Sequence, residues 1–197
     1  IEHDAVLHPG QRMEDLGYVK VDCVRLKPDG HIDLNHLEEL LQTNRDRQTL
    51  VSLMHANNEI GNMVDQEQVG QLCEIYQALF HSDTVQTVGH LPINVKQAKV
   101  DFITASAHKF HGPKGLGFIY INNEIQVKPF IYGGSQERNM RGGTENVYGI
   151  AGLSKAMDIA YEELESQKQQ VQELKSYMQD RLGEAFPDVV FNGDPSR

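Results

Sequence analysis

Short apolar runs alternate along this chain with longer stretches in which apolar residues recur every three or four positions. The first pattern is typical of buried strands and the second of amphipathic helices, so their alternation favours an α/β layer structure with a mostly parallel sheet flanked by helices. The chain is predicted to form strands at about 49–54, 78–82, 102–105 and 117–121.

The helical pattern is clearest in two places. Apolar residues recur at helical spacing after Asp65, which is predicted to cap that helix, and Cys73 falls on its inward face. One long helix is predicted over 147–186, followed by a short strand at 189–191 and a turn at 192–195.

The bulk composition excludes several classes of protein. Apolar residues make up 39% of the 197 positions, and no stretch reaches the roughly 18 to 20 consecutive apolar residues of a membrane span, so we expect a soluble protein. The net charge of -10 would repel a phosphate backbone, which argues against nucleic acid as a general partner. The chain begins with Ile1 and has no signal-peptide pattern, and we expect it to be part of something longer.

Cysteine and histidine usage argues against disulfides and metal sites. Cys23 and Cys73 lie fifty positions apart with no CxxC spacing, which fits a reducing, cytoplasmic compartment. The nine histidines have no matching cluster of cysteines or carboxylates, so no metal is predicted.

Polar residues follow three of the predicted strands. Because ligands of open α/β sheets bind beyond the carboxyl ends of the strands, Asn58, Asp83 and Lys109 could converge on one crevice. A lysine that is partly desolvated or near a cation such as protonated His108 can form a Schiff base, and an aspartate can hold a pyridine nitrogen protonated. Spacing alone also allows these residues to be solvated strand ends.

Several short sequence motifs are more specific evidence than the spacing of single residues. They are, in order, Glu2-His3 with Ala5-Val6-Leu7, Met54-His55-Ala56-Asn57-Asn58-Glu59-Ile60-Gly61, Asp83-Thr84-Val85-Gln86 with Gly89, Ser106-Ala107-His108-Lys109, Gly112-Pro113-Lys114-Gly115, and Gly133-Gly134-Ser135-Gln136-Glu137-Arg138 to Arg141-Gly142-Gly143-Thr144-Glu145-Asn146. Through these motifs the chain resembles the cysteine desulfurases of the NifS/IscS group, which are class-V aminotransferases, over nearly its whole length.

The resemblance implies a fold and a cofactor. It implies the fold type I architecture of pyridoxal-phosphate-dependent transferases, which is aspartate aminotransferase-like, and pyridoxal 5'-phosphate as the cofactor. Residues 1–186 would be an incomplete large domain and residues 187–197 the start of the C-terminal small domain. The family's phosphate-binding loop would precede His3, and its catalytic cysteine and its substrate-binding arginine would follow Arg197. Members of the family are homodimers.

The resemblance also implies roles for residues around the cofactor ring. Lys109 would bind the cofactor covalently and then move a proton at the substrate carbon. Asp83 would face the pyridine nitrogen, and Gln86 would hydrogen-bond the phenolic oxygen. His3 would stack on the ring as a second catalytic residue.

Four further residues are implied in binding. Ser106 and His108 would hold the cofactor phosphate, and Asn58 would meet the substrate carboxylate or the phenolic oxygen. Thr144 would contact the phosphate bound to the partner subunit.

The activity implied for the full-length enzyme is conversion of L-cysteine to L-alanine, with the sulfur passed on as an enzyme persulfide. The sulfur acceptor would be a protein such as an iron–sulfur scaffold. The segment alone is predicted to be inactive, because it would lack the family's phosphate and substrate contacts at both ends. Cys23 and Cys73 are both expected to be structural. Two alternatives stay open: a selenocysteine lyase, and a non-catalytic scaffold or sulfur-delivery partner of the same fold.

Overall fold

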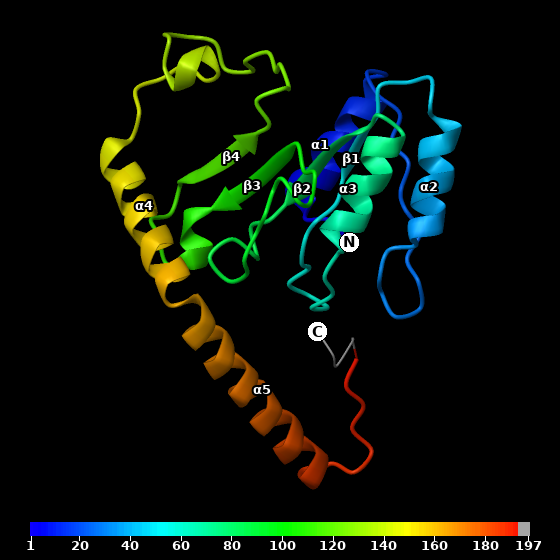
Figure 1. The fold of residues 1–197 in the computed structure, drawn as a ribbon, viewed down its shortest axis with the longest axis vertical. Coiled ribbons are helices and arrows are strands. Elements are labelled where there is room, and N and C mark those ends of the chain that lie inside the picture. The colour runs from blue at the N-terminus through cyan, green and yellow to red at the C-terminus, as the bar shows by residue number, and fades with distance from the viewer. Residues whose placement is uncertain (193–197) are drawn as a thin grey trace.

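The computed structural model describes residues 1–192, in which four strands form one sheet that is flanked by helices (Figure 1). The strands, in the order in which they lie side by side, are β1 (Leu50–Ser52), β2 (Leu79–Asp83), β3 (Phe102–Ser106) and β4 (Gly117–Ile121). Strands β1, β2 and β3 run parallel, and β4 pairs antiparallel with β3. The predicted α/β structure with a mostly parallel sheet is confirmed.

All four predicted strands are present, but the first is shorter than expected. The sequence predicts a strand over 49–54, whereas β1 comprises three residues. Beyond it the chain still runs beside β2, because the Leu53 N–H donates to the His81 carbonyl at 3.1 Å. The apolar run is therefore buried beyond the end of the regular ladder.

The helices begin at side chains that accept hydrogen bonds from the first turn in four of five cases. They are α1 (Asp4–Asp15), α2 (Leu34–Thr43), α3 (Gln66–Ile75), α4 (Val147–Glu162) and α5 (Leu164–Ala185), with the short 3-10 helices η1 (Ala107–Phe110) and η2 (Glu137–Asn139). Asp65 caps α3 as predicted, since its carboxylate accepts from the Gln68 N–H at 3.1 Å. Within residues 1–192, none of the helices combines the length and the apolar character needed to cross a membrane.

The main core lies on one face of the sheet. Phe80 of β2 and Val69 of α3 are completely buried there, and Ile103 of β3 packs in the same cluster. Cys73 is 2% exposed in this cluster, so its predicted inward position is confirmed. Hydrophobic burial of this one face holds α3 against the sheet.

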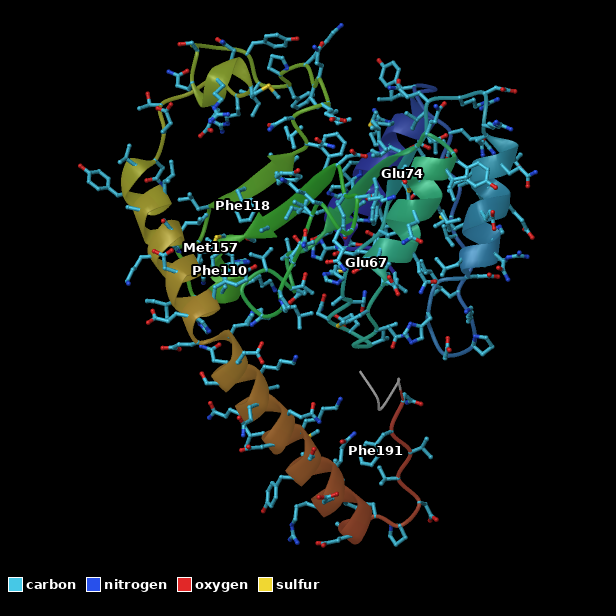
Figure 2. All side chains as sticks on the ribbon, in the orientation of Figure 1. Glu67, Glu74, Phe110, Phe118, Met157 and Phe191 are labelled. Carbon is cyan, nitrogen blue, oxygen red and sulfur yellow. The ribbon has the colours of Figure 1, made fainter. Side chains whose placement is uncertain are left out.

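A second cluster holds η1 in place. Phe110 of η1 is 1% exposed and packs with Phe118 of β4 and Met157 of α4, and Figure 2 shows the three between the sheet and α4. Ala160 completes the contact from α4. The turn after β3 is therefore fixed by side chains from two other elements.

The prediction of one long helix over 147–186 is wrong. The helix breaks at Glu163, whose backbone angles are φ -95° and ψ 3°, and two helices result. The Glu163 N–H still donates to Ile159 and its carbonyl still accepts from Gln167, so the chain bends without losing either bond. Only α4 has a surface to pack against, and α5 extends away from the sheet with no buried residue (Figure 1).

The predicted strand at 189–191 is also wrong, because these residues have no regular structure. A strand needs a partner edge, but the segment that follows α5 lies away from the sheet (Figure 1). Val190 is 78% exposed. The turn predicted at 192–195 lies, except for its first residue, outside the described residues.

Candidate functional site

The three parallel strands end at a common edge of the sheet. Asp83 is the last residue of β2, Ser106 is the last of β3, and Asn58 follows the end of β1. Asp83 pairs with Thr104, two residues before Ser106, so Asp83 and Ser106 lie on the same face of the sheet. A hydrogen bond of 2.9 Å from the His55 N–H to the Asp83 carbonyl joins the first two strand ends.

Asp83 is held as a buried carboxylate at this edge. It is 6% exposed, and its Oδ1 accepts from the Val85 N–H at 2.9 Å. The next residue, Thr84, donates to the Thr104 carbonyl through its N–H at 3.0 Å and its hydroxyl at 2.8 Å. A buried carboxylate requires donors or a cation, which suits Asp83 to pairing with a protonated ring nitrogen.

Gln86 lies half-buried in a tight loop after Asp83. The loop is closed by the Thr87 and Val88 N–H groups, which both donate to the Thr84 carbonyl at 2.9 Å. The buried His55 ring reaches the Thr87 hydroxyl through Nδ1 at 2.9 Å. Burial lowers the pKa of His55, so its ring is neutral near pH 7.

Lys109 has a fixed backbone and an exposed side chain. Helix η1 buries Ala107 and Phe110 and leaves His108 and Lys109 exposed. The imidazole Nε2 of His90 lies 2.9 Å from the Lys109 carbonyl oxygen and can donate to it. The turn that carries the amine is therefore attached to the loop that carries Gln86.

His3 and Asn58 line one hollow near the N-terminal end of α1. The lining residues are Glu2, His3, Asp4, Met54, Asn57, Asn58 and Glu59. His3 also caps α1, because its Nδ1 accepts from the Ala5 N–H at 3.1 Å. In the neutral ring this bond places the proton on Nε2. The structure thus brings together two predicted site residues that are 55 positions apart in the sequence.

Thr144 lies apart from this hollow. It is exposed in the segment between β4 and α4. Its predicted role concerns a second subunit and stays a prediction.

His81 forms a polar link across three strands on the sheet face opposite the main core. Its Nδ1 lies 2.7 Å from the Ser52 hydroxyl and its Nε2 lies 3.4 Å from the Thr104 hydroxyl. Burial lowers the pKa of His81, and the Asp83 carboxylate opposes this shift in part. The face that carries Asp83 and Ser106 is therefore polar in its interior as well as at its edge.

Neither cysteine belongs to the hollow. Burial raises the pKa of the Cys73 thiol to about 12, so this thiol stays protonated and is a poor nucleophile. Cys23 is exposed and lies in an irregular segment. That segment forms only an isolated bridge, between Leu26 and Ile32, so it lacks the pairing that a strand requires.

Within residues 1–192, no three His, Cys, Asp or Glu side chains are grouped so that they could hold a metal ion.

The sequence and the fold both match known proteins. The family model described as aminotransferase class-V matches residues 1–197. The chain belongs to this family. A cysteine desulfurase IscS of Dictyoglomus turgidum is 41% identical over 196 residues, which are 100% of this chain and 49% of that protein. The chain spans about half the length of the curated class-V relatives it matches.

Solved structures give the same result for this class-V chain. A NifS-like protein is 40% identical with a TM-score of 0.87, covering 93% of this chain and 50% of that one. A second structure, SspA in complex with cysteine, is 33% identical with a TM-score of 0.72, covering 80% and 45%. The expected fold type I architecture is confirmed by this likeness and by the mostly parallel sheet.

Sequence reasoning missed three residues near the class-V site. In the sequence Glu2 stands out only as the neighbour of His3, and no pattern indicates that its carboxyl is buried against the end of β1. No sequence pattern indicates a role for His55 or His90, apart from their positions inside or beside the matching motifs. Their contacts join residues 19 and 32 positions apart, which no local pattern reveals.

Proposed function

We propose that a full-length polypeptide containing this chain is a pyridoxal-phosphate-dependent cysteine desulfurase. The observation that carries the proposal is the strand edge, where the buried carboxylate of Asp83 ends β2 and the exposed amine of Lys109 follows the adjacent parallel strand β3. The cysteine desulfurase names of the relatives and the cysteine complex of SspA support the same chemistry.

The residues present fit the cofactor. Asp83, buried and held by the Val85 N–H, would keep the pyridine nitrogen protonated, and Gln86 in the adjoining loop would donate to the phenolic oxygen. Ser106 and His108, on either side of the buried Ala107, would hold the phosphate. When bound, pyridoxal phosphate supplies the electron sink for a carbanion at the substrate carbon.

The side chains around the substrate would bind it and move protons. Lys109 would bind the cofactor through Nζ and, once displaced by the substrate amine, take the proton from the α carbon and return one there. His3 would stack on the ring, and Asn58 beside it would bind the substrate carboxylate or the phenolic oxygen. In the overall reaction a cysteine thiol of the enzyme would lose its proton and attack the substrate sulfur. The C–S bond would break as the S–S bond forms on the enzyme, the β carbon would take up a proton, and alanine would leave.

The sulfur chemistry needs a nucleophilic cysteine besides Cys23 and Cys73. We expect the 197-residue chain alone to bind the cofactor weakly and to release no sulfide. We also propose a homodimer in which Thr144 serves the partner's phosphate, a cytoplasmic enzyme, and a protein as the sulfur acceptor. Residues 1–186 would form part of the large domain and residues 187–197 would begin the small domain.

Absorbance of added pyridoxal phosphate tests the central assignment. The full-length polypeptide should develop the visible band of a cofactor bound covalently to lysine, and Lys109→Ala should abolish the band and reduce alanine formation at least about a hundredfold. Lys114→Ala, a matched change in the following turn, should keep the band. A band that persists in Lys109→Ala contradicts the assignment.

The choice of substrate is tested on the same preparation. A desulfurase should form alanine from cysteine, whereas a selenocysteine lyase should prefer selenocysteine by a large factor. A non-catalytic scaffold should form alanine from neither.

A further inference from the structure

Glu2 ties the segment that carries His3 to the end of β1. Its Oε1 accepts from the Met54 N–H at 2.6 Å, and the Asn57 amide donates to the Ile1 carbonyl at 2.7 Å. Residues on both sides of these bonds line the hollow that contains His3 and Asn58. The position of the His3 ring relative to the strand edge therefore depends on Glu2.

The second carboxyl oxygen of Glu2 is anomalous. Within residues 1–192, Oε2 of Glu2 is the one buried side-chain nitrogen or oxygen that has no hydrogen-bond partner. An ionised carboxylate that is buried with one oxygen unpartnered is much more costly than a neutral carboxyl in the same place.

Partial burial also favours the neutral form of Glu2. Burial is the largest influence and raises the pKa of its carboxyl, the Met54 N–H lowers it, and the nearby Asp83 carboxylate adds a smaller rise. His3, Asp4 and Glu59 also line the hollow, and all three are exposed. Asp83 is buried and Glu2 is partly buried, and each of two such neighbouring carboxylates makes ionisation of the other less favourable.

We propose that Glu2 is a positioning residue of the cofactor site that keeps its proton: Oε1 holds the His3 segment against β1, and the neutral carboxyl leaves Asp83 as the buried negative charge. The proposal rests on the proposed function, in which Asp83 pairs with the positively charged pyridine nitrogen of the cofactor. A second ionised carboxylate nearby would compete with Asp83 for that single positive charge. Oε1 accepts from Met54, so the proton resides on Oε2.

The first test needs no cofactor. Because the pKa of Glu2 is higher in the folded chain than in the unfolded one, ionisation of Glu2 removes stability as the pH rises through and above the ordinary glutamate range. Glu2→Gln keeps the acceptor for Met54 and cannot ionise. The denaturant midpoint of Glu2→Gln in the full-length apoprotein should therefore rise relative to wild type between about pH 4.5 and pH 7.5.

Glu67→Gln is the matched control. Glu67 is an exposed acid on α3 (Figure 2), and its Oε1 accepts from the Gln97 amide. The denaturant midpoint of Glu67→Gln should change with pH in parallel with that of wild type over the same range. A Glu2→Gln midpoint that also runs parallel to wild type overturns the claim that Glu2 is a buried acid with a raised pKa.

The second test adds pyridoxal phosphate. Glu2→Gln should bind it within about threefold of wild type, and the pH at which its visible band titrates should not move, whereas Glu2→Ala should bind it at least about tenfold more weakly. A shifted titration in Glu2→Gln, or wild-type affinity in Glu2→Ala, overturns the proposal. If Glu2→Ala does not fold, Glu2→Gln decides alone. If wild type forms no band that depends on Lys109, the proposed function fails, while the apoprotein midpoints still decide whether Glu2 keeps its proton.

Discussion

His55 illustrates how one residue can connect two parts of the site. Its N–H binds the Asp83 carbonyl and its ring binds the Thr87 hydroxyl in the loop that holds Gln86. Because the pKa of His55 is lowered by burial, protonation of its ring is unfavourable in the folded chain.

The pH dependence of stability should report this burial. His55 contributes stability above its unfolded pKa, and that stability is lost as the pH falls from about 7 towards 5. His55→Gln should cost about 1 to 2 kcal/mol of unfolding free energy at pH 7.5 through the weakened bond to Thr87, and less at pH 5, as measured by urea unfolding. For the control His8→Gln, at an exposed position, the difference in unfolding free energy from wild type should not shrink between pH 7.5 and pH 5. If the difference for His55→Gln stays constant over this range, the account is contradicted.

At the scale of elements, η1 is positioned by contacts from the loop after β2 and from α4. Gly89 of that loop has φ +80°, and a Cβ there would lie 2.6 Å from the Cβ of Phe110 and 3.3 Å from that of Ala160. The neighbouring His90 binds the Lys109 carbonyl. The close approach therefore sets the distance between the loop of Gln86 and the backbone of Lys109.

Substitution of Gly89 should disturb this junction. Gly89→Ala combines left-handed backbone strain of about 1 to 2 kcal/mol with overpacking of about 1 to 3 kcal/mol. Gly115→Ala is the matched control, because Gly115 has φ +77° with nothing within 4 Å of the added Cβ. In urea unfolding, Gly89→Ala should lose more unfolding free energy than Gly115→Ala. Equal losses would show that Phe110 moves to accommodate the added Cβ at no cost.

The whole molecule has two parts of unequal packing. The sheet, α3 and α4 share buried clusters, whereas α5 contributes no buried residue and exposes Val171, Leu174, Tyr177 and Met178. Helices of this kind owe little of their stability to tertiary packing.

Hydrogen exchange should resolve this difference in the 197-residue chain. The amides of α5 should exchange at least about a hundredfold faster than those of β2, since local opening of α5 disrupts no core. Mass spectrometry of peptides from the two regions measures this directly. Equal protection of α5 and β2 would show that α5 is held by contacts other than those described here.

The sequence by itself determined the α/β class, the four strands and the cap at Asp65, and its motifs indicated the family. These depend on local patterns, namely periodicity, capping chemistry and residue order along the chain. The roles predicted for Lys109, Asp83 and Gln86 remain predictions, although their placement after neighbouring strands follows from the same reasoning.

Only the tertiary structure decided where the helix after Val147 breaks, that 189–191 forms no strand, and that Glu2, His55 and His90 belong beside the site. The break reflects where α4 loses its packing surface, and the absent strand reflects a missing partner edge. Burial of Glu2 arises from a contact with Met54, 52 positions away. Such contacts exist only once the strands are in register and their ends meet, so no pattern of neighbouring residues encodes them visibly.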